Sequence, residues 1–122
     1  MTLNLRRSAE DIGKCAYGIF KKGSEMIGKR IGIAGGKLTG NEMARALSKA
    51  LREPVVYNKV PAAVYRSFGF PGADDLGNMF QFYDEFEKEL NKTGDVAVSK
   101  QLNPDMLNFE QWLYRYAGQI PL

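Results

Sequence analysis

Hydrophobic side chains recur every three or four residues along most of this 122-residue chain, which predicts α-helices. Three of the periodic stretches open on a polar residue that can accept a backbone N–H, namely Ser8, Thr39 and Asn108. Each is followed three residues later by an acid or a glutamine, the pattern of a capping box at a helix N-terminus. The periodicity predicts about five helices, over residues 8–22, 39–51, 61–68, 74–90 and 108–116.

Two short stretches favour strands. Residues 30–34 read Arg-Ile-Gly-Ile-Ala, and residues 55–60 are rich in β-branched and aromatic side chains. Two strands alone are marginal as a sheet, so either the helices carry the core or the strands pair with another chain. Residues 95–103 are expected to be irregular or briefly extended. The expected fold is a helix-rich α/β unit, one domain over 1–122, with two or three short strands.

Composition narrows the range of functions. The net charge is only +3, and the basic residues are spread along the chain, so no nucleic-acid partner is expected. No apolar run approaches the ~20 residues that span a bilayer, and the N-terminus is too short and polar for a signal peptide. We therefore expect a cytoplasmic protein with no membrane partner. Without histidine, and with Cys15 as the single cysteine, neither a metal site nor an internal disulfide is predicted.

A glycine-rich segment over residues 30–40 has the order of a dinucleotide-binding unit, with a strand, a glycine turn and a helix. Glycines at such a turn let the backbone approach a pyrophosphate at the helix N-terminus. The G-x-G-x-x-G spacing fails, because Lys37 stands where the second glycine is due after Gly35. We therefore favour a plain strand-to-helix turn. The alternative is a phosphate site built from Gly35, Gly36, Lys37, Gly40 and Lys59.

Tyr17 and Lys21 have the Tyr-x-x-x-Lys spacing with which short-chain dehydrogenases transfer a proton. Residues four apart share one face of a helix, so the two side chains could act together. Both residue types are common, however, and the spacing often arises by chance. We therefore favour an exposed Lys21 beside a partly buried Tyr17, and we predict no catalytic residue.

Aromatic residues are dense between residues 68 and 86. In a helix over 74–90 the inward stripe would hold Leu76, Met79, Phe80, Tyr83, Phe86 and Leu90. Phe82 falls outside that stripe, and the aromatics together cover more than the usual apolar arc of a surface helix. Part of this surface is expected to face a second lobe, a ligand cleft or another copy of the protein.

Two dense segments, Gly69–Tyr83 and Leu102–Leu113, resemble the C-terminal lobe of the NmrA-like family. The resemblance runs from about residue 10 to residue 113. That family comprises atypical relatives of the short-chain dehydrogenases and reductases that bind NAD(P) and act as redox-sensing regulators. Its nucleotide site lies in an N-terminal Rossmann half that precedes the matched region. The resemblance therefore implies NADP(H) for the full-length family and no cofactor in this chain.

The resemblance implies a non-catalytic regulatory lobe that binds a protein partner or itself as a homo-oligomer. The cleft or partner surface that it implies comprises Phe70, Met79, Phe80, Phe82 and Tyr83. One alternative is the substrate-side lobe of an NAD(P)H-dependent reductase that needs a separate nucleotide-binding half. A second is a small phosphate- or nucleotide-binding module at residues 35–40. The chain itself is expected to be a truncated product, a separately encoded lobe or a fragment.

Overall fold

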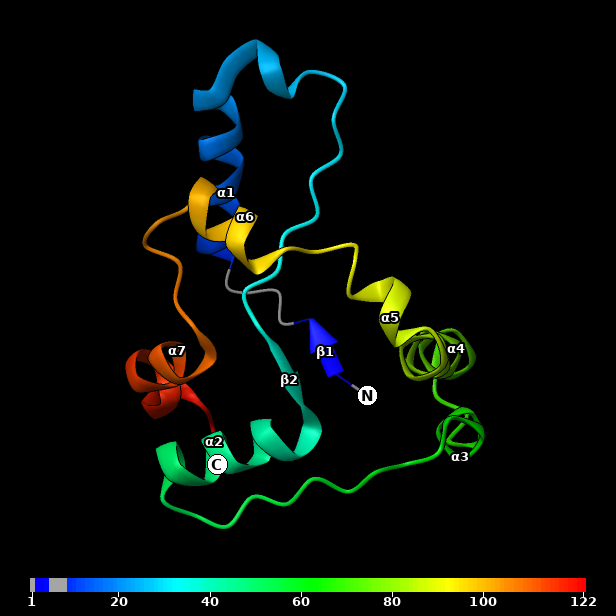
Figure 1. The fold of residues 1–122 in the computed structure, drawn as a ribbon. Coiled ribbons are helices and arrows are strands. Elements are labelled where there is room, and N and C mark those ends of the chain that lie inside the picture. The colour runs from blue at the N-terminus through cyan, green and yellow to red at the C-terminus, as the bar shows by residue number, and fades with distance from the viewer. Residues whose placement is uncertain (1, 5–8) are drawn as a thin grey trace.

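The computed structural model describes residues 2–4 and 9–122, and these are mostly helical (Figure 1). The described helices are α1 (Ala9–Lys22), α2 (Gly40–Leu51), α3 (Ala62–Ser67), α4 (Ala73–Glu85), α5 (Glu87–Leu90), α6 (Val96–Leu102) and α7 (Phe109–Tyr116). Short 3-10 turns, η1 (Gly23–Met26) and η2 (Ala117–Gln119), follow α1 and α7. Strands β1 (Thr2–Asn4) and β2 (Lys37–Thr39) pair antiparallel, with Thr2 opposite Thr39. The helix-rich α/β class predicted from the sequence is confirmed. Within the described ranges, no helix is long and apolar enough to cross a bilayer.

Two of the predicted capping boxes are confirmed. At the start of α2 the Thr39 hydroxyl accepts the Glu42 N–H at 3.2 Å, and the Glu42 carboxylate accepts the Thr39 N–H at 2.8 Å. At the start of α7 the Asn108 and Gln111 side chains make the same reciprocal pair, both at 2.8 Å. Each box satisfies two backbone donors that the helix itself leaves open, so both helices begin where the sequence predicts. Ser8 lies outside the described residues.

The predicted positions of the strands are wrong. Residues 55–60 are not a strand, and the chain there runs from α2 to α3 without a neighbouring strand to pair with. The segment is tied to α2 by Ser48, whose hydroxyl accepts the Val55 N–H at 2.9 Å. Within residues 30–34 only Ile33 pairs, in an isolated parallel bridge with Asp95. The strand β2 begins later, at Lys37, because its partner β1 lies alongside those residues.

Two differences raise the helix count above the expected five. The long helix predicted over 74–90 is broken at Phe86, whose φ of −115° and ψ of 34° are not helical, and it becomes α4 and α5. The stretch 95–103, expected to be irregular, contains α6. Asp95 is the N-cap of α6, because its carboxylate accepts the Ala97 N–H at 2.8 Å. An aspartate before a short apolar stretch was the signal for this helix, and the sequence-based prediction did not use it.

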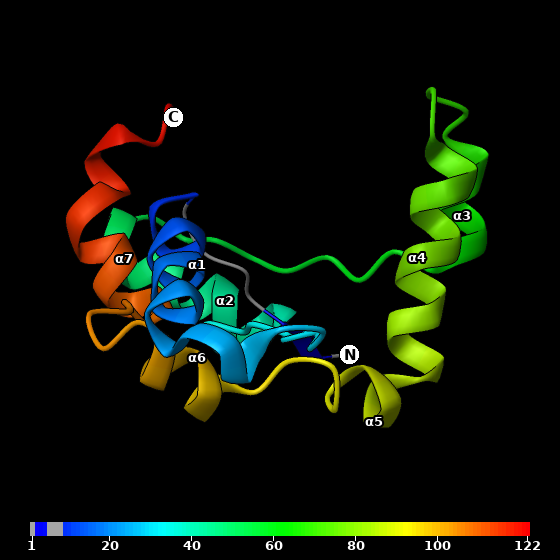
Figure 2. The same cartoon turned by 90° about the horizontal axis from the view of Figure 1, so that it is seen from above.

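The helices form two groups that stand apart in Figure 2. One group, called the body here, comprises α1, α2, α6 and α7. Its core includes Cys15, Leu102 and Met106 where α1 packs on α6, and Leu113, which is fully buried. The other group, called the arm, comprises α3, α4 and their connecting turn, residues 62–85. A Cβ on Gly77 would lie 2.5 Å from the Arg66 Cγ, so α3 and α4 are in close contact.

Candidate functional site

The chain exposes more surface than a folded monomer of its size. Its accessible area is 8767 Å² at a mass of 13.6 kDa. A compact monomer of that mass exposes about 6,600 Å², so the excess is about 2,200 Å². The arm stands apart from the body in Figure 2, so an open arrangement of the chain agrees with this excess. The arm and the surface of the body that faces it are therefore candidate functional surfaces.

The predicted aromatic cluster is organised around Tyr65 of α3, which the sequence analysis placed in a short helix without a role. The Tyr65 ring centroid lies 5.3 Å from that of Phe80 and 5.6 Å from that of Phe70, both near edge-on. Phe80 in turn lies 6.5 Å from Tyr83. Phe80, Tyr83 and Met79 are half-buried, and Phe70 is exposed at the turn between the two helices. Of the five predicted residues, Phe70, Phe80 and Tyr83 therefore belong to one ring network that the arm buries only in part, and Phe82 joins it through Tyr83, with ring centroids 6.5 Å apart.

Phe82 lies on a different face of α4. Its ring stacks on Phe86 with centroids 5.0 Å apart, and the two side chains are 47% and 46% exposed. The outward position of Phe82 agrees with its place outside the apolar stripe. Phe86 was expected to point inward and does not, because the helix breaks at this residue. Leu76, also expected inward, is exposed, whereas the buried positions of α4 are the small residues Ala73 and Gly77.

A shallow cleft separates the arm from the start of α2. Tyr57, Val60, Tyr65 and Phe80 line an apolar hollow of about 230 Å³. A second hollow of about 360 Å³ shares Tyr57, Val60 and Phe80 with the first and reaches the polar side chains Lys59, Gln81 and Glu85. The Tyr57 ring lies directly against Gly40, where a Cβ would come within 2.7 Å of it. The cleft therefore combines an apolar floor with a mixed polar rim.

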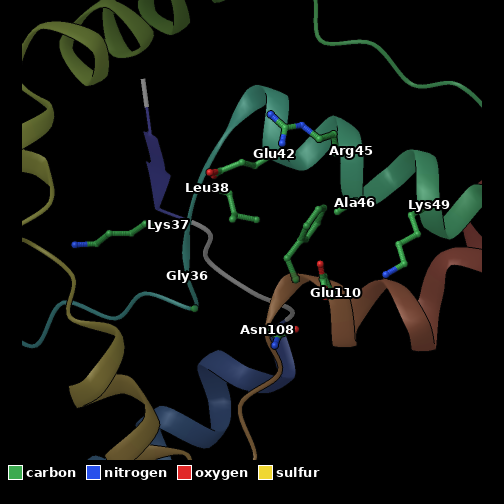
Figure 3. A pocket seen from close by; sticks show the side chains of 11 residues that line it. Gly36, Lys37, Leu38, Glu42, Arg45, Ala46, Lys49, Asn108 and Glu110 are labelled. Carbon is green, nitrogen blue, oxygen red and sulfur yellow. The ribbon is translucent and has the colours of Figure 1, made fainter.

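A second groove runs along the body between α2 and α7 (Figure 3). Two hollows of about 540 and 390 Å³ share Ala46, Lys49 and Glu110 and so form one continuous groove. The cationic side chains along its α2 wall are Arg45 and Lys49 of α2 and Arg52, the C-cap residue directly after it. The floor includes small residues, and the α7 wall carries Phe109, Glu110 and the exposed Tyr114. We call this feature the basic groove. The sequence analysis did not identify it, because its cations are spaced along one helix and do not form a run.

A sequence model of the NmrA-like family matches residues 5–113 of the chain. This chain belongs to the NmrA-like family. The match includes the whole arm, α2 and most of α7, so both grooves are built mainly from residues of the family region. The described residues of this NmrA-like chain contain one sheet, the antiparallel pair β1–β2, and no parallel sheet of the Rossmann type.

The glycine segment of the NmrA-like chain does not match a pyrophosphate-binding turn. Gly35 and Gly36 line the basic groove, but neither has a positive φ. Lys37 points away from the groove in Figure 3, and its ammonium donates to the Asn91 carbonyl at 2.8 Å. The Glu42 carboxylate lies at the start of α2, where a phosphate would need to bind.

The remaining two residues of the phosphate alternative line the other cleft. Gly40 and Lys59 belong to the hollow between α2 and the arm, together with the acids Asp84 and Glu85. The structure therefore does not bring the five candidate residues into one site.

Tyr17 and Lys21 of the NmrA-like chain do contact one another, but in another geometry. The Lys21 ammonium lies 5.5 Å from the centroid of the Tyr17 ring, a cation–π contact. Tyr17 is 65% exposed, more than expected, because α1 turns Cys15 and Gly18 toward α6 and leaves Tyr17 on its outer side.

Two polar groups of α1 are buried against α6 and the segment after it. Burial raises the pKa of the Cys15 thiol, whose Sγ donates weakly to the Ser99 carbonyl at 3.8 Å. The Asn103 amide donates to the Asp11 carboxylate at 3.1 Å. Both contacts join segments far apart in the sequence and have a structural role. Over the described ranges, no group of three or more cysteines or acids could hold a metal ion.

Proposed function

We propose that this NmrA-like chain is a non-catalytic, protein-binding regulatory lobe that acts by association through the aromatic arm. The observation that carries the proposal is the exposure of large apolar side chains on the arm and at its end, above all Phe82 stacked on the adjoining Phe86. Stacked rings open to water favour association, because burying apolar area contributes about 25 cal/mol per Å² before association costs.

The total exposed area of the chain is large enough to include an interface of ordinary size. A typical specific interface buries about 800 Å² on each partner, and the chain exposes about 2,200 Å² beyond a compact monomer. The partner is a protein or another copy of this chain, and we favour a homo-oligomer. In a full-length NmrA-like regulator, NADP(H) would be held by the N-terminal half, and this lobe would supply the surface that responds by binding or releasing partners.

The proposal is tested by sedimentation velocity at tens of micromolar, comparing the wild type with the variant Phe82→Gln, Phe86→Gln. We expect the wild type to form dimers or larger species and the variant to dissociate at least about tenfold more readily. The matched control is Phe20→Gln, Ile27→Gln, which removes two more exposed apolar side chains from the body, 81% and 82% exposed. The control should associate like the wild type.

Two results would contradict the proposal. A wild type that stays monomeric, alone and with NADP(H) added, would show that the chain does not associate through the arm. Turnover of NADPH by the isolated chain would show that the chain is catalytic, since hydride transfer requires a bound cofactor. Calorimetric titration with NADP(H), with light scattering on the same sample, measures cofactor binding and association, and the loss of NADPH absorbance measures turnover.

A further inference from the structure

The charge of this protein is divided unevenly between its two parts. The arm, residues 62–85, holds one cation, Arg66, and the four acids Asp74, Asp75, Asp84 and Glu85, a net charge of −3. The whole chain carries +3, so the remainder carries +6. The four helices of the body hold half of that positive charge, a net +3, so a negative arm stands apart from a positive body within one sequence.

The outer face of α4 presents this negative charge together with the exposed rings. Asp75, Asn78, Phe82 and Glu85 follow one another at spacings of three, four and three, which places them on one side of the helix. Phe86, directly after the end of α4, joins this side because its ring stacks on Phe82. All five are exposed. Asn78 accepts from the Arg66 guanidinium at 3.2 Å, and Glu85 accepts from the Gln81 amide at 2.8 Å, so the face is held in a defined shape. We call these five residues the acidic stripe.

The basic groove has the complementary charge and shape. Arg45 and Lys49 are exposed one turn apart on α2, and Arg52, the C-cap residue after the helix, is exposed as well. None of the three makes a salt bridge with a residue in the described ranges. They outnumber the groove's acids, Glu42 and Glu110. The floor includes Ala46, Ala50 and Ala117, and small side chains let another helix approach closely. The lengths agree as well, because 12 and 13 residues of helix are about 18 and 20 Å long.

The arm of the same chain does not lie near this groove. In Figure 2 the arm and α7 lie on opposite sides of the molecule, with α1 and α2 between them. The complementary pair can therefore be satisfied only between two chains. If each chain offers its stripe and its groove to the other, two identical contacts form and the assembly closes as a twofold dimer.

We propose that the acidic stripe of one copy binds in the basic groove of a second copy, reciprocally, to form a closed homodimer. This inference rests on the proposed function, because it names the partner and the receiving surface for the arm. The Phe82–Phe86 stack lies over the alanine floor, Asp75 and Glu85 lie beside the α2 cations, and Tyr114 borders the contact from α7. Added salt should raise the dissociation constant of the dimer, because the ion pairs form near the surface and salt screens them.

The test is a charge swap in two separate variants. The groove variant is Arg45→Glu, Lys49→Glu, and the stripe variant is Asp75→Lys, Glu85→Lys. Each variant opposes like charges in both contacts, so we expect each alone to have a dimer dissociation constant at least about 100-fold above the wild type. Mixed in equal amounts they should form a heterodimer, because opposite charges meet in both contacts. In one contact the acidic groove of the first variant meets the basic stripe of the second, and in the other contact the unchanged stripe meets the unchanged groove. Sedimentation velocity and native mass spectrometry measure the species.

Two control variants carry the same changes in charge at exposed sites elsewhere. Lys22→Glu, Lys100→Glu matches the groove variant, and Glu25→Lys, Asp105→Lys matches the stripe variant. Both should dimerise like the wild type. Recovery of the heterodimer also shows that the two swapped variants are folded, and circular dichroism confirms this for each alone.

The outcomes separate this inference from the proposed function. If the wild type is a dimer and the swapped variants dimerise equally well, or if they dissociate and the mixture stays monomeric, the stripe-in-groove pairing is wrong while association through the arm stands. If the wild type is monomeric under all conditions, both proposals fail.

Discussion

Replacement of Gly18 by alanine tests how closely α1 lies on α6. A Cβ at this position would overlap the main-chain carbonyl oxygen of Leu102 and lie 2.8 Å from its carbonyl carbon. Since the obstacle is backbone, it cannot rotate aside as a side chain would, and α1 and α6 must move apart. That movement would loosen the packing of Cys15 against Leu102 and Met106.

The expected change in the free energy of unfolding of Gly18→Ala is the balance of two opposing effects. Alanine is about 1 kcal/mol more favourable than glycine inside a helix. Overpacking of a close contact costs about 1–3 kcal/mol, and here a rigid carbonyl places the cost toward the upper end. We therefore expect Gly18→Ala to lower the free energy of unfolding by about 1–2 kcal/mol, a decrease in Tm of roughly 3–8 °C for a chain of this size.

Gly13 is the matched control on the same helix, because a Cβ there meets no atom within 4 Å. Gly13→Ala should stabilise the protein by about 0.5–1 kcal/mol through helix propensity alone. Urea and thermal unfolding followed by far-UV circular dichroism, at one protein concentration, compare the two variants. If Gly18→Ala is as stable as Gly13→Ala, the described contact between α1 and Leu102 is wrong.

Two further predictions concern α6 and its contact with α1. Asp95→Ala removes the carboxylate that caps α6 and should cost about 1 kcal/mol of unfolding free energy in urea titrations, whereas Asp95→Asn should keep most of it; equal losses in both variants would rule out the cap. Burial raises the pKa of the Cys15 thiol above its ordinary value of 9.0, so the native state favours the protonated thiol. The stability that this contributes is fully present below pH 9.0 and is lost as the pH rises through the folded-state pKa. Urea titrations from pH 8 to 10.5 should show a steeper loss of stability in the wild type than in Cys15→Ala, and parallel curves would contradict the assignment.

The sequence alone predicted the helices whose ends depend on near neighbours. The Thr39 and Asn108 caps involve partners three residues away, so the start of α2 and α7 can be read from the residues themselves. The position of Phe82 outside the apolar stripe is likewise a consequence of helical geometry. These features needed no knowledge of where the rest of the chain lies.

The sequence-based errors occurred where the partner is distant. A strand exists at Lys37–Thr39 because Thr2–Asn4 lies beside it, and residues 55–60 have β-prone side chains but no strand to pair with. β-propensity describes how well side chains fit a sheet that already exists, so it could not select between these two segments. Phe86 was placed inward because the break after Glu85 is not apparent from the periodicity.

The candidate surfaces depend on tertiary structure even more strongly. The residue types were evident in the sequence, which has aromatic residues on the arm, a modest net charge and scattered cations. Only the folded chain separates the arm from the body, aligns Arg45, Lys49 and Arg52 along one groove and turns Lys37 toward Asn91. Local hydrogen bonds and helical periodicity act over a few residues, whereas surfaces are assembled from segments whose proximity depends on the path of the whole chain.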